Sequence, residues 1–231
     1  MSSPCKNFCV MTTGRSGSTS LMEALERHDD IALPMKQIAC ADNELLRPEG
    51  LAKHCADYAG LLGEAIDGPD QLIDAFYRHN AAAPFAGFKS MPHRHANYEA
   101  FVSRSDITFI TLVREDRAST VASFMLALRR GTWRRHGQVP KQTWTFGPED
   151  KPQAQSILAR LDDNLRMLER IPNAIRVSYE AICREEFHSP ELERLFGRPI
   201  GIDNPRTPIS GEAYTENWGA FVSALGISGQ V

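Results

Sequence analysis

The chain has 231 residues, of which 42% are hydrophobic and 24% are charged. This composition allows a sizeable apolar core and excludes a mainly disordered chain. The 26 Lys and Arg residues are outnumbered by 29 Asp and Glu residues, and the formal net charge of −3 argues against a protein that coats DNA. At this length we expect a single domain over residues 1–231.

The cysteines and the apolar segments indicate the cellular setting. The five cysteines form no Cys-x-x-Cys pair and no zinc-type spacing, so we expect reduced thiols. The first residues show no long apolar signal segment, and apolar runs such as 107–113 are far shorter than the roughly 20 residues of a membrane helix. We therefore expect a reducing, cytoplasmic location without a membrane span.

Strand-like and helix-like segments alternate along the chain. Apolar, β-branched runs predict strands, and apolar residues at helical spacing predict helices. The expected strands are 8–13, 85–90, 107–113 and 174–179, and the expected helices are 18–27, 117–130 and 152–170. Residues 34–70 mix helix and loop, whereas Gly and Pro in 131–151 predict a long loop of the kind that often forms a lid.

The predicted strands are continuous apolar runs, which is typical of parallel strands buried on both faces. This pattern predicts an α/β fold, a three-layer sandwich with a central, mostly parallel sheet. Ligands of such sheets bind at the carboxyl ends of the strands. The residues that follow Thr13, Lys89 and Val113 are therefore expected to line one site.

A loop rich in glycine and hydroxyl groups joins the first predicted strand to the first predicted helix. It reads Thr13-Gly14-Arg15-Ser16-Gly17-Ser18-Thr19, and its amides, its hydroxyls and the helix N-terminus favour an anion. The loop has no Gly-Lys pair at the spacing of a nucleoside triphosphate loop, which weakens a magnesium-ATP interpretation. The alternative is a plain turn that caps the helix through a hydroxyl.

Arg114 follows the strand predicted at 107–113, where a magnesium-dependent enzyme of this type has an acidic residue. Asp116 is better explained as a helix cap. Ser123, nine residues after Arg114, is placed to donate a hydrogen bond to the same ligand. We expect a second anion rather than a metal here, and the alternative for Arg114 is an ion pair with Glu115 or Asp116.

Together these motifs resemble the sulfotransferase family that uses 3′-phosphoadenosine 5′-phosphosulfate. Further short similarities occur in the expected order along the chain. They are Arg27-His28-Asp29-Asp30-Ile31, Val177-Ser178-Tyr179-Glu180 and Glu216-Asn217-Trp218. The resemblance implies a P-loop-like sulfotransferase fold, with this nucleotide as co-substrate, adenosine 3′,5′-bisphosphate as product and no metal.

The resemblance also implies a role for each matching residue. Gly14, Arg15, Ser16, Gly17, Ser18 and Thr19 would hold the 5′-phosphosulfate, and Arg114 and Ser123 the 3′-phosphate. Arg15 would also stabilise charge that develops on the leaving phosphate. Tyr179 would contact adenine, or else belong simply to the core.

Some residues depart from the family pattern. Cytosolic members have Lys where this chain has Arg15, and many place the helical Ser one residue earlier than Ser123. Both departures resemble the bacterial and carbohydrate-type branches. The Arg-Lys-Gly loop of cytosolic members is missing, and Arg206 is the nearby cation that would substitute for it.

Three residues are candidates for the chemistry itself. Lys89 ends a predicted strand and resembles the family's second active-site lysine, with a surface lysine as the alternative. Glu44 lies where carbohydrate-type members keep a catalytic Glu, and His93 is the second candidate for the general base. The alternative for both is an ordinary surface position, which also applies to His95.

Arg129, Arg130, Arg134 and Arg135 surround Trp133 at the start of the predicted loop. This pattern would suit RNA, but with an acidic remainder of the chain we expect no nucleic acid. The pattern favours a lid that covers the donor or an anionic acceptor. The alternative is an ordinary solvated turn.

Three functions remain open at this point. The first is transfer of a sulfuryl group to the hydroxyl of a carbohydrate, glycolipid or small molecule. The second is a nucleotide or small-molecule kinase on a degenerate loop, and the third is a sulfotransferase-like protein that binds nucleotide without turnover. The identity of the acceptor does not follow from the fold class.

Overall fold

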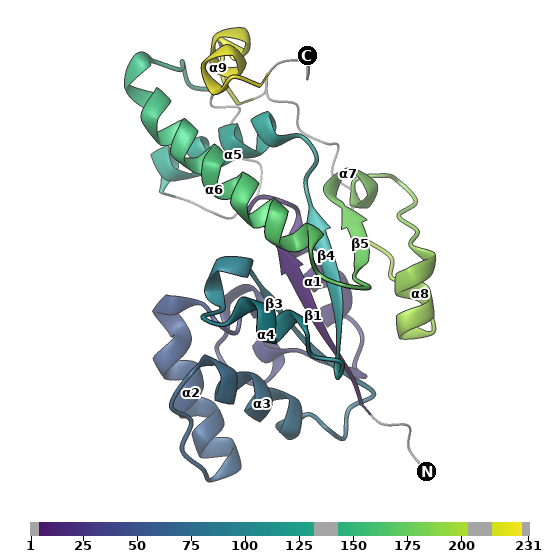
Figure 1. Cartoon of the computed structure of the whole chain (residues 1–231). Helices are drawn as coiled ribbons and strands as arrows, with labels where there is room; N and C mark the ends of the chain where they lie inside the picture. The colour runs from purple at the N-terminus through teal and green to yellow at the C-terminus, as the bar shows by residue number, and fades with distance from the viewer. Residues whose placement is uncertain (1–4, 132–142, 203–213, 228–231) are drawn as a thin grey trace.

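The computed structural model describes residues 5–131, 143–202 and 214–227. Within these ranges one five-stranded sheet has the order β2-β3-β1-β4-β5, and every neighbouring pair is parallel. The strands are β1 (Lys6–Thr12), β2 (Ile31–Ala32), β3 (Phe85–Ser90), β4 (Ile107–Val113) and β5 (Ile175–Ser178). The predicted α/β class with a parallel sheet is confirmed (Figure 1).

Helices and short 3₁₀ turns connect the strands. The helices are α1 (Ser18–Glu26), α2 (Pro48–Leu62), α3 (Pro69–His79), α4 (Tyr98–Val102), α5 (Arg117–Arg130), α6 (Lys151–Glu169), α7 (Tyr179–Ile182), α8 (Pro190–Phe196) and α9 (Trp218–Leu225). The 3₁₀ turns are η1 (Pro34–Lys36), η2 (Ala41–Asn43), η3 (Pro92–Arg94) and η4 (Pro148–Asp150). The predicted strands and helices agree with these bounds to within two residues, whereas β2, α3, α4, α7, α8 and α9 were not predicted.

Both faces of the sheet are buried, because alternate strand residues enter two separate apolar clusters. Phe8 and Val10 of β1 pack with α1, α7 and α8, whereas Cys9 and Met11 pack with α2, α3 and α4. Helices therefore cover the sheet on both sides, as the continuous apolar strands predicted (Figure 1).

A third apolar cluster joins α5, α6 and α9 with Trp144. Trp144 forms an isolated parallel bridge with Thr215, and Arg129 at the end of α5 pairs with Asp150 at 2.5 Å. The described part of the predicted 131–151 loop thus contains η4 and a bridge, and residues 132–142 lie outside the described residues. In the described ranges, no helix combines the length and the apolar character needed to cross a bilayer.

The strand register brings three strand tips together at one edge of the sheet. Val10 of β1 pairs with Lys89 of β3, and Thr12 of β1 pairs with Leu112 of β4. The loops after β3, β1 and β4 are therefore neighbours, which confirms the expected common edge for the residues after Thr13, Lys89 and Val113.

Candidate active site

The loop between β1 and α1 has a backbone that exposes the start of the helix. Gly17 is the N-cap of α1 and has a left-handed φ of 78°, and Arg15 has a left-handed φ of 63°. Within the described residues, no side chain caps α1 and no acidic residue lies in its first turn. No described side chain therefore neutralises the positive end of the helix dipole, which is the arrangement that an anion site of the expected kind requires.

The two glycines of the loop are required by close packing. A Cβ atom at Gly14 would lie 2.3 Å from Cζ of Phe124 on α5. At Gly17 it would lie 2.7 Å from ring carbon Cδ2 of Tyr179 and also 2.7 Å from Cδ1 of Ile182. Side chains from α5 and α7 therefore press on the loop and hold its conformation.

Hydroxyl groups tie the base of the loop to the sheet. The Ser16 hydroxyl donates to the Thr13 carbonyl at 2.7 Å and lies 2.5 Å from the hydroxyl of Thr12, which in turn is 2.9 Å from the Leu112 carbonyl. Ser16 is fully buried. In this structure the hydroxyl therefore braces the loop, and the backbone amide is the group of Ser16 that stays a candidate for holding a donor phosphate.

Thr13 carries a buried hydroxyl group at the start of this loop. Its Oγ1 makes no hydrogen bond to any described residue, although the residue is buried at the tip of β1. Buried hydroxyl groups are normally satisfied, so an unsatisfied one at a strand tip beside a proposed ligand site supports that site.

Arg15 and Ser123, which are 108 positions apart in sequence, are in direct contact. The Nε of Arg15 donates to Oγ of Ser123 at 2.8 Å, and Ser123 is buried in α5. The helix is positioned by Asp116, whose carboxylate accepts from the Ser119 amide at 2.8 Å, so the predicted cap is confirmed. This contact joins α5 to residues 13–19, the glycine-rich loop and first turn of α1, which we call the anion loop after its proposed ligand.

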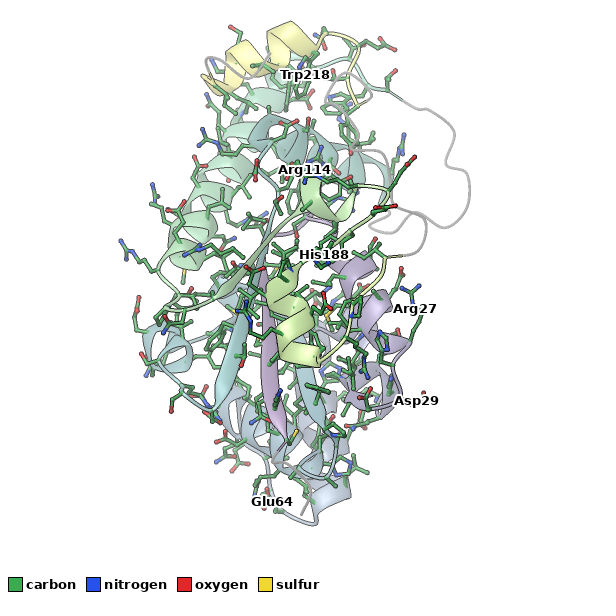
Figure 2. All side chains as sticks on the ribbon, turned by 90° about the vertical axis from the view of Figure 1, so that its right-hand side faces the viewer. Arg27, Asp29, Glu64, Arg114, His188 and Trp218 are labelled. Atoms are coloured by element: carbon green, nitrogen blue, oxygen red, sulfur yellow. The ribbon has the colours of Figure 1, made fainter. Side chains whose placement is uncertain are left out.

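Arg114 lies at the same edge and is 3% exposed. Its guanidinium carbon is 4.7 Å from the centre of the Tyr179 ring, a cation–π distance, and the same ring packs against Gly17. Figure 2 shows Arg114 beside α7, the short helix that begins at Tyr179. Burial raises the pKa of Tyr179 to about 12, so its phenol is neutral at physiological pH.

Glu44 and Lys89 are neighbours at the tip of β3. Their backbones form an isolated parallel bridge. β2 pairs with the start of β3, and after η2 the chain comes back alongside the end of the same strand. Glu44 is 6% exposed and Lys89 is 4% exposed, which contradicts the surface alternatives for both. Oε1 of Glu44 accepts from Nε of Arg94 at 3.3 Å.

The two histidines of the following segment have different surroundings. His93 in η3 keeps an exposed surface, and partial burial of its ring and the Arg94 guanidinium lower its pKa. His95 is buried, its Nε2 lies 2.9 Å from the Ser90 hydroxyl, and its ring stacks on Phe101. Burial lowers the pKa of His95 to about 4, so it is a neutral core residue rather than a surface one.

The basic cluster near residue 130 is described only in part. Arg129 pairs with Asp150 and lies 5.8 Å from the centre of the Trp144 ring, so it has a structural role in the third apolar cluster. Trp133, Arg134, Arg135 and Arg206 lie outside the described residues.

Three residues of this edge were missed by sequence reasoning or given no role there. They are Phe124, Arg94 and Asn164. Phe124 was detectable only as an apolar residue of a helix, and Asn164 interrupts the apolar stripe of α6, where it is buried and interacts with His93. In the part of the chain that the structure describes, no group of three or more His, Cys, Asp or Glu side chains could hold a metal ion.

A scan against models of protein families found no match, and a search among curated proteins found no similar sequence.

Proposed function

We propose that the protein is a sulfotransferase with a P-loop-like sulfotransferase fold, which transfers a sulfuryl group from 3′-phosphoadenosine 5′-phosphosulfate to an acceptor hydroxyl. The observation that carries the proposal is the 2.8 Å contact between Arg15 of the anion loop and Ser123 of α5. It joins the residues proposed for the 5′-phosphosulfate and for the 3′-phosphate in a single site.

The donor-side roles follow from the placement of the residues. The amides at the start of α1 would hold the 5′-phosphosulfate, with Ser18 and Thr19 adding hydroxyls. Arg15 would stabilise charge on the leaving phosphate, while Arg114 and Ser123 would bind the 3′-phosphate and Tyr179 would adjoin the nucleotide. Since Arg114 occupies a strand tip where a magnesium-dependent enzyme would carry an acidic residue, the proposal is for metal-independent transfer.

The reaction needs a base and a cation on the acceptor side. The acceptor oxygen forms a bond to sulfur while the bond from sulfur to the 5′-phosphate oxygen breaks, and the leaving oxygen keeps the electron pair. Glu44 would accept the proton of the acceptor hydroxyl, with His93 as the rival base. Lys89, on the neighbouring strand tip, would be the second cation near the transferred group.

Thermal stability with nucleotides tests the donor site. We expect adenosine 3′,5′-bisphosphate to raise the melting temperature without magnesium, because bound ligand stabilises the folded state. A shift with ATP that requires magnesium, and none with the bisphosphate, would support the kinase alternative instead. Transfer of labelled sulfate to a panel of sugars, lipids and phenols then separates an active enzyme from a protein that binds nucleotide without turnover.

A further inference from the structure

A polar cluster lies beside the anion loop, on the next strand tip of the sheet. We use the name acceptor-side cluster for Glu44, Lys89, His93, Arg94, Arg160 and Asn164. These residues come from β3, from the segments around η2 and η3, and from α6, which packs against η3. The strand register places Lys89 next to Val10 of β1, three residues before the anion loop begins.

Positive charge exceeds negative charge in this cluster. Lys89, Arg94 and Arg160 are cationic, and Glu44 is the carboxylate that Arg94 contacts. Asp42 of η2 is a second nearby carboxylate, because it and Glu44 both act on the thiol of Cys40. Arg47 acts on the same thiol, and Glu49 interacts with Arg94, so with Asp42, Arg47 and Glu49 included four cations are set against three carboxylates.

Two guanidinium groups in the cluster have donors that no described residue uses. Arg94 donates through Nε to Glu44, and within the described ranges its two terminal nitrogens make no hydrogen bond. Arg160 makes no hydrogen bond or ion pair with any described residue. The planar pair of terminal nitrogens on a guanidinium matches the two oxygens of a carboxylate or phosphate.

α6 holds these groups on one side. Asn164 and Arg160 are four positions apart and therefore lie on the same helix face, and both side chains act on the ring of His93. The cations of Arg94 and Arg160 lower the pKa of His93 in addition to the larger effect of burial. The potential at this ring is therefore raised by cations, although Glu44 acts in the opposite direction.

We infer that the acceptor-side cluster binds a hydroxyl compound that carries its own carboxylate or phosphate group, with Arg94 and Arg160 pairing with that anion. The inference rests on the proposed function, since it names the acceptor class for the same site. The anion would hold the acceptor hydroxyl near Glu44 and His93, and Asn164 would act as a positioning residue for His93.

The test compares sugars that differ by one charged group, in the presence of saturating adenosine 3′,5′-bisphosphate. Calorimetry with methyl glucuronide and methyl glucoside should show at least tenfold tighter binding of the glucuronide, and a hexose phosphate distinguishes phosphate from carboxylate as the preferred anion. In NMR titrations the glucuronide should raise the pKa of His93, whereas the glucoside should leave it unchanged.

Variants on α6 assign the effect to this cluster. Arg160→Gln should weaken glucuronide binding about tenfold and leave glucoside binding within twofold. Arg166→Gln is the matched control, because Arg166 is on the same helix but pairs with Asp163 at the surface. Equal binding of the charged and neutral sugars, or loss of glucuronide binding in Arg166→Gln as well, overturns the inference while bisphosphate binding is retained. Failure to bind the bisphosphate itself overturns the proposed function.

Discussion

The anion loop and the acceptor-side cluster lie on adjacent strand tips but are built in opposite ways. The loop is one contiguous segment, and its properties come from backbone conformation, glycine packing and an uncapped helix start. The cluster gathers side chains from β3, η3, α6 and the chain after η2. The first kind of site is encoded locally, whereas the second exists only once the sheet and α6 are assembled.

The strongest test of the loop is Arg15→Ala. We expect kcat/KM for sulfate transfer to fall about 1,000-fold, because a lost charge-stabilising donor typically costs 10²–10³-fold in rate. Transfer of labelled sulfate measures the effect. Arg27→Ala, an exposed arginine that donates to the Gly201 carbonyl, is the control and should keep activity within twofold. If kcat/KM of Arg15→Ala falls less than tenfold, Arg15 does not stabilise the transition state.

His95, which is buried two residues after His93 of the acceptor-side cluster, should make the stability of the protein depend on pH. The pKa of His95 is about 4 in the folded protein and near 6.5 in an unfolded chain. Between these values the unfolded state binds more protons, so the free energy of unfolding decreases as the pH falls. We expect this residue to account for about 2 to 3 kcal/mol of stability lost between pH 7 and pH 4.5.

Urea unfolding at the two pH values, for the natural protein and for His95→Gln, checks this expectation. The variant should lack that share of the pH dependence, whatever its stability at pH 7. Equal losses in the two proteins would contradict the burial of a neutral His95.

The base on the cluster side is tested by two conservative variants. Glu44→Gln should lower kcat about 100-fold, since general base catalysis contributes at least that much, whereas His93→Gln should lower it less than tenfold. Glu49→Gln, which removes an exposed carboxylate paired with Arg47, is the control. If His93 is the base, its variant shows the larger loss. The kcat of the natural enzyme should then rise with pH and become constant above the pKa of His93, which lies below 6.5.

The smallest expected effect concerns the contact that joins the loop to α5. Ser123→Ala should weaken binding of adenosine 3′,5′-bisphosphate about fivefold to tenfold, because a hydrogen bond of this type contributes about 1 kcal/mol. Ser119→Ala is a matched control on the same helix, since the buried Ser119 hydroxyl has no hydrogen-bond partner among the described residues. Calorimetry that finds equal affinities for the two variants would contradict a ligand role for Ser123.

The sequence was most informative where the signal is local. Apolar runs predicted β3 and β4, glycines and hydroxyls predicted a loop between β1 and α1, and Asp116 was identified as a cap. β2 was missed because a strand of two residues shows no periodic pattern of apolar residues. α7, with four residues, is also too short to show a helical pattern. The pairing of Glu44 with Lys89 and the contact of Asn164 with His93 depend on the assembled fold, so spacing along the chain could not predict them.

The left-handed backbone at Arg15 has a consequence for engineering. A residue with a side chain is disfavoured in this conformation by about 1 kcal/mol or more, and glycine is not. Selection of variants for heat resistance alone should therefore favour Gly at position 15, and under the proposed function such variants would gain stability and lose sulfate transfer.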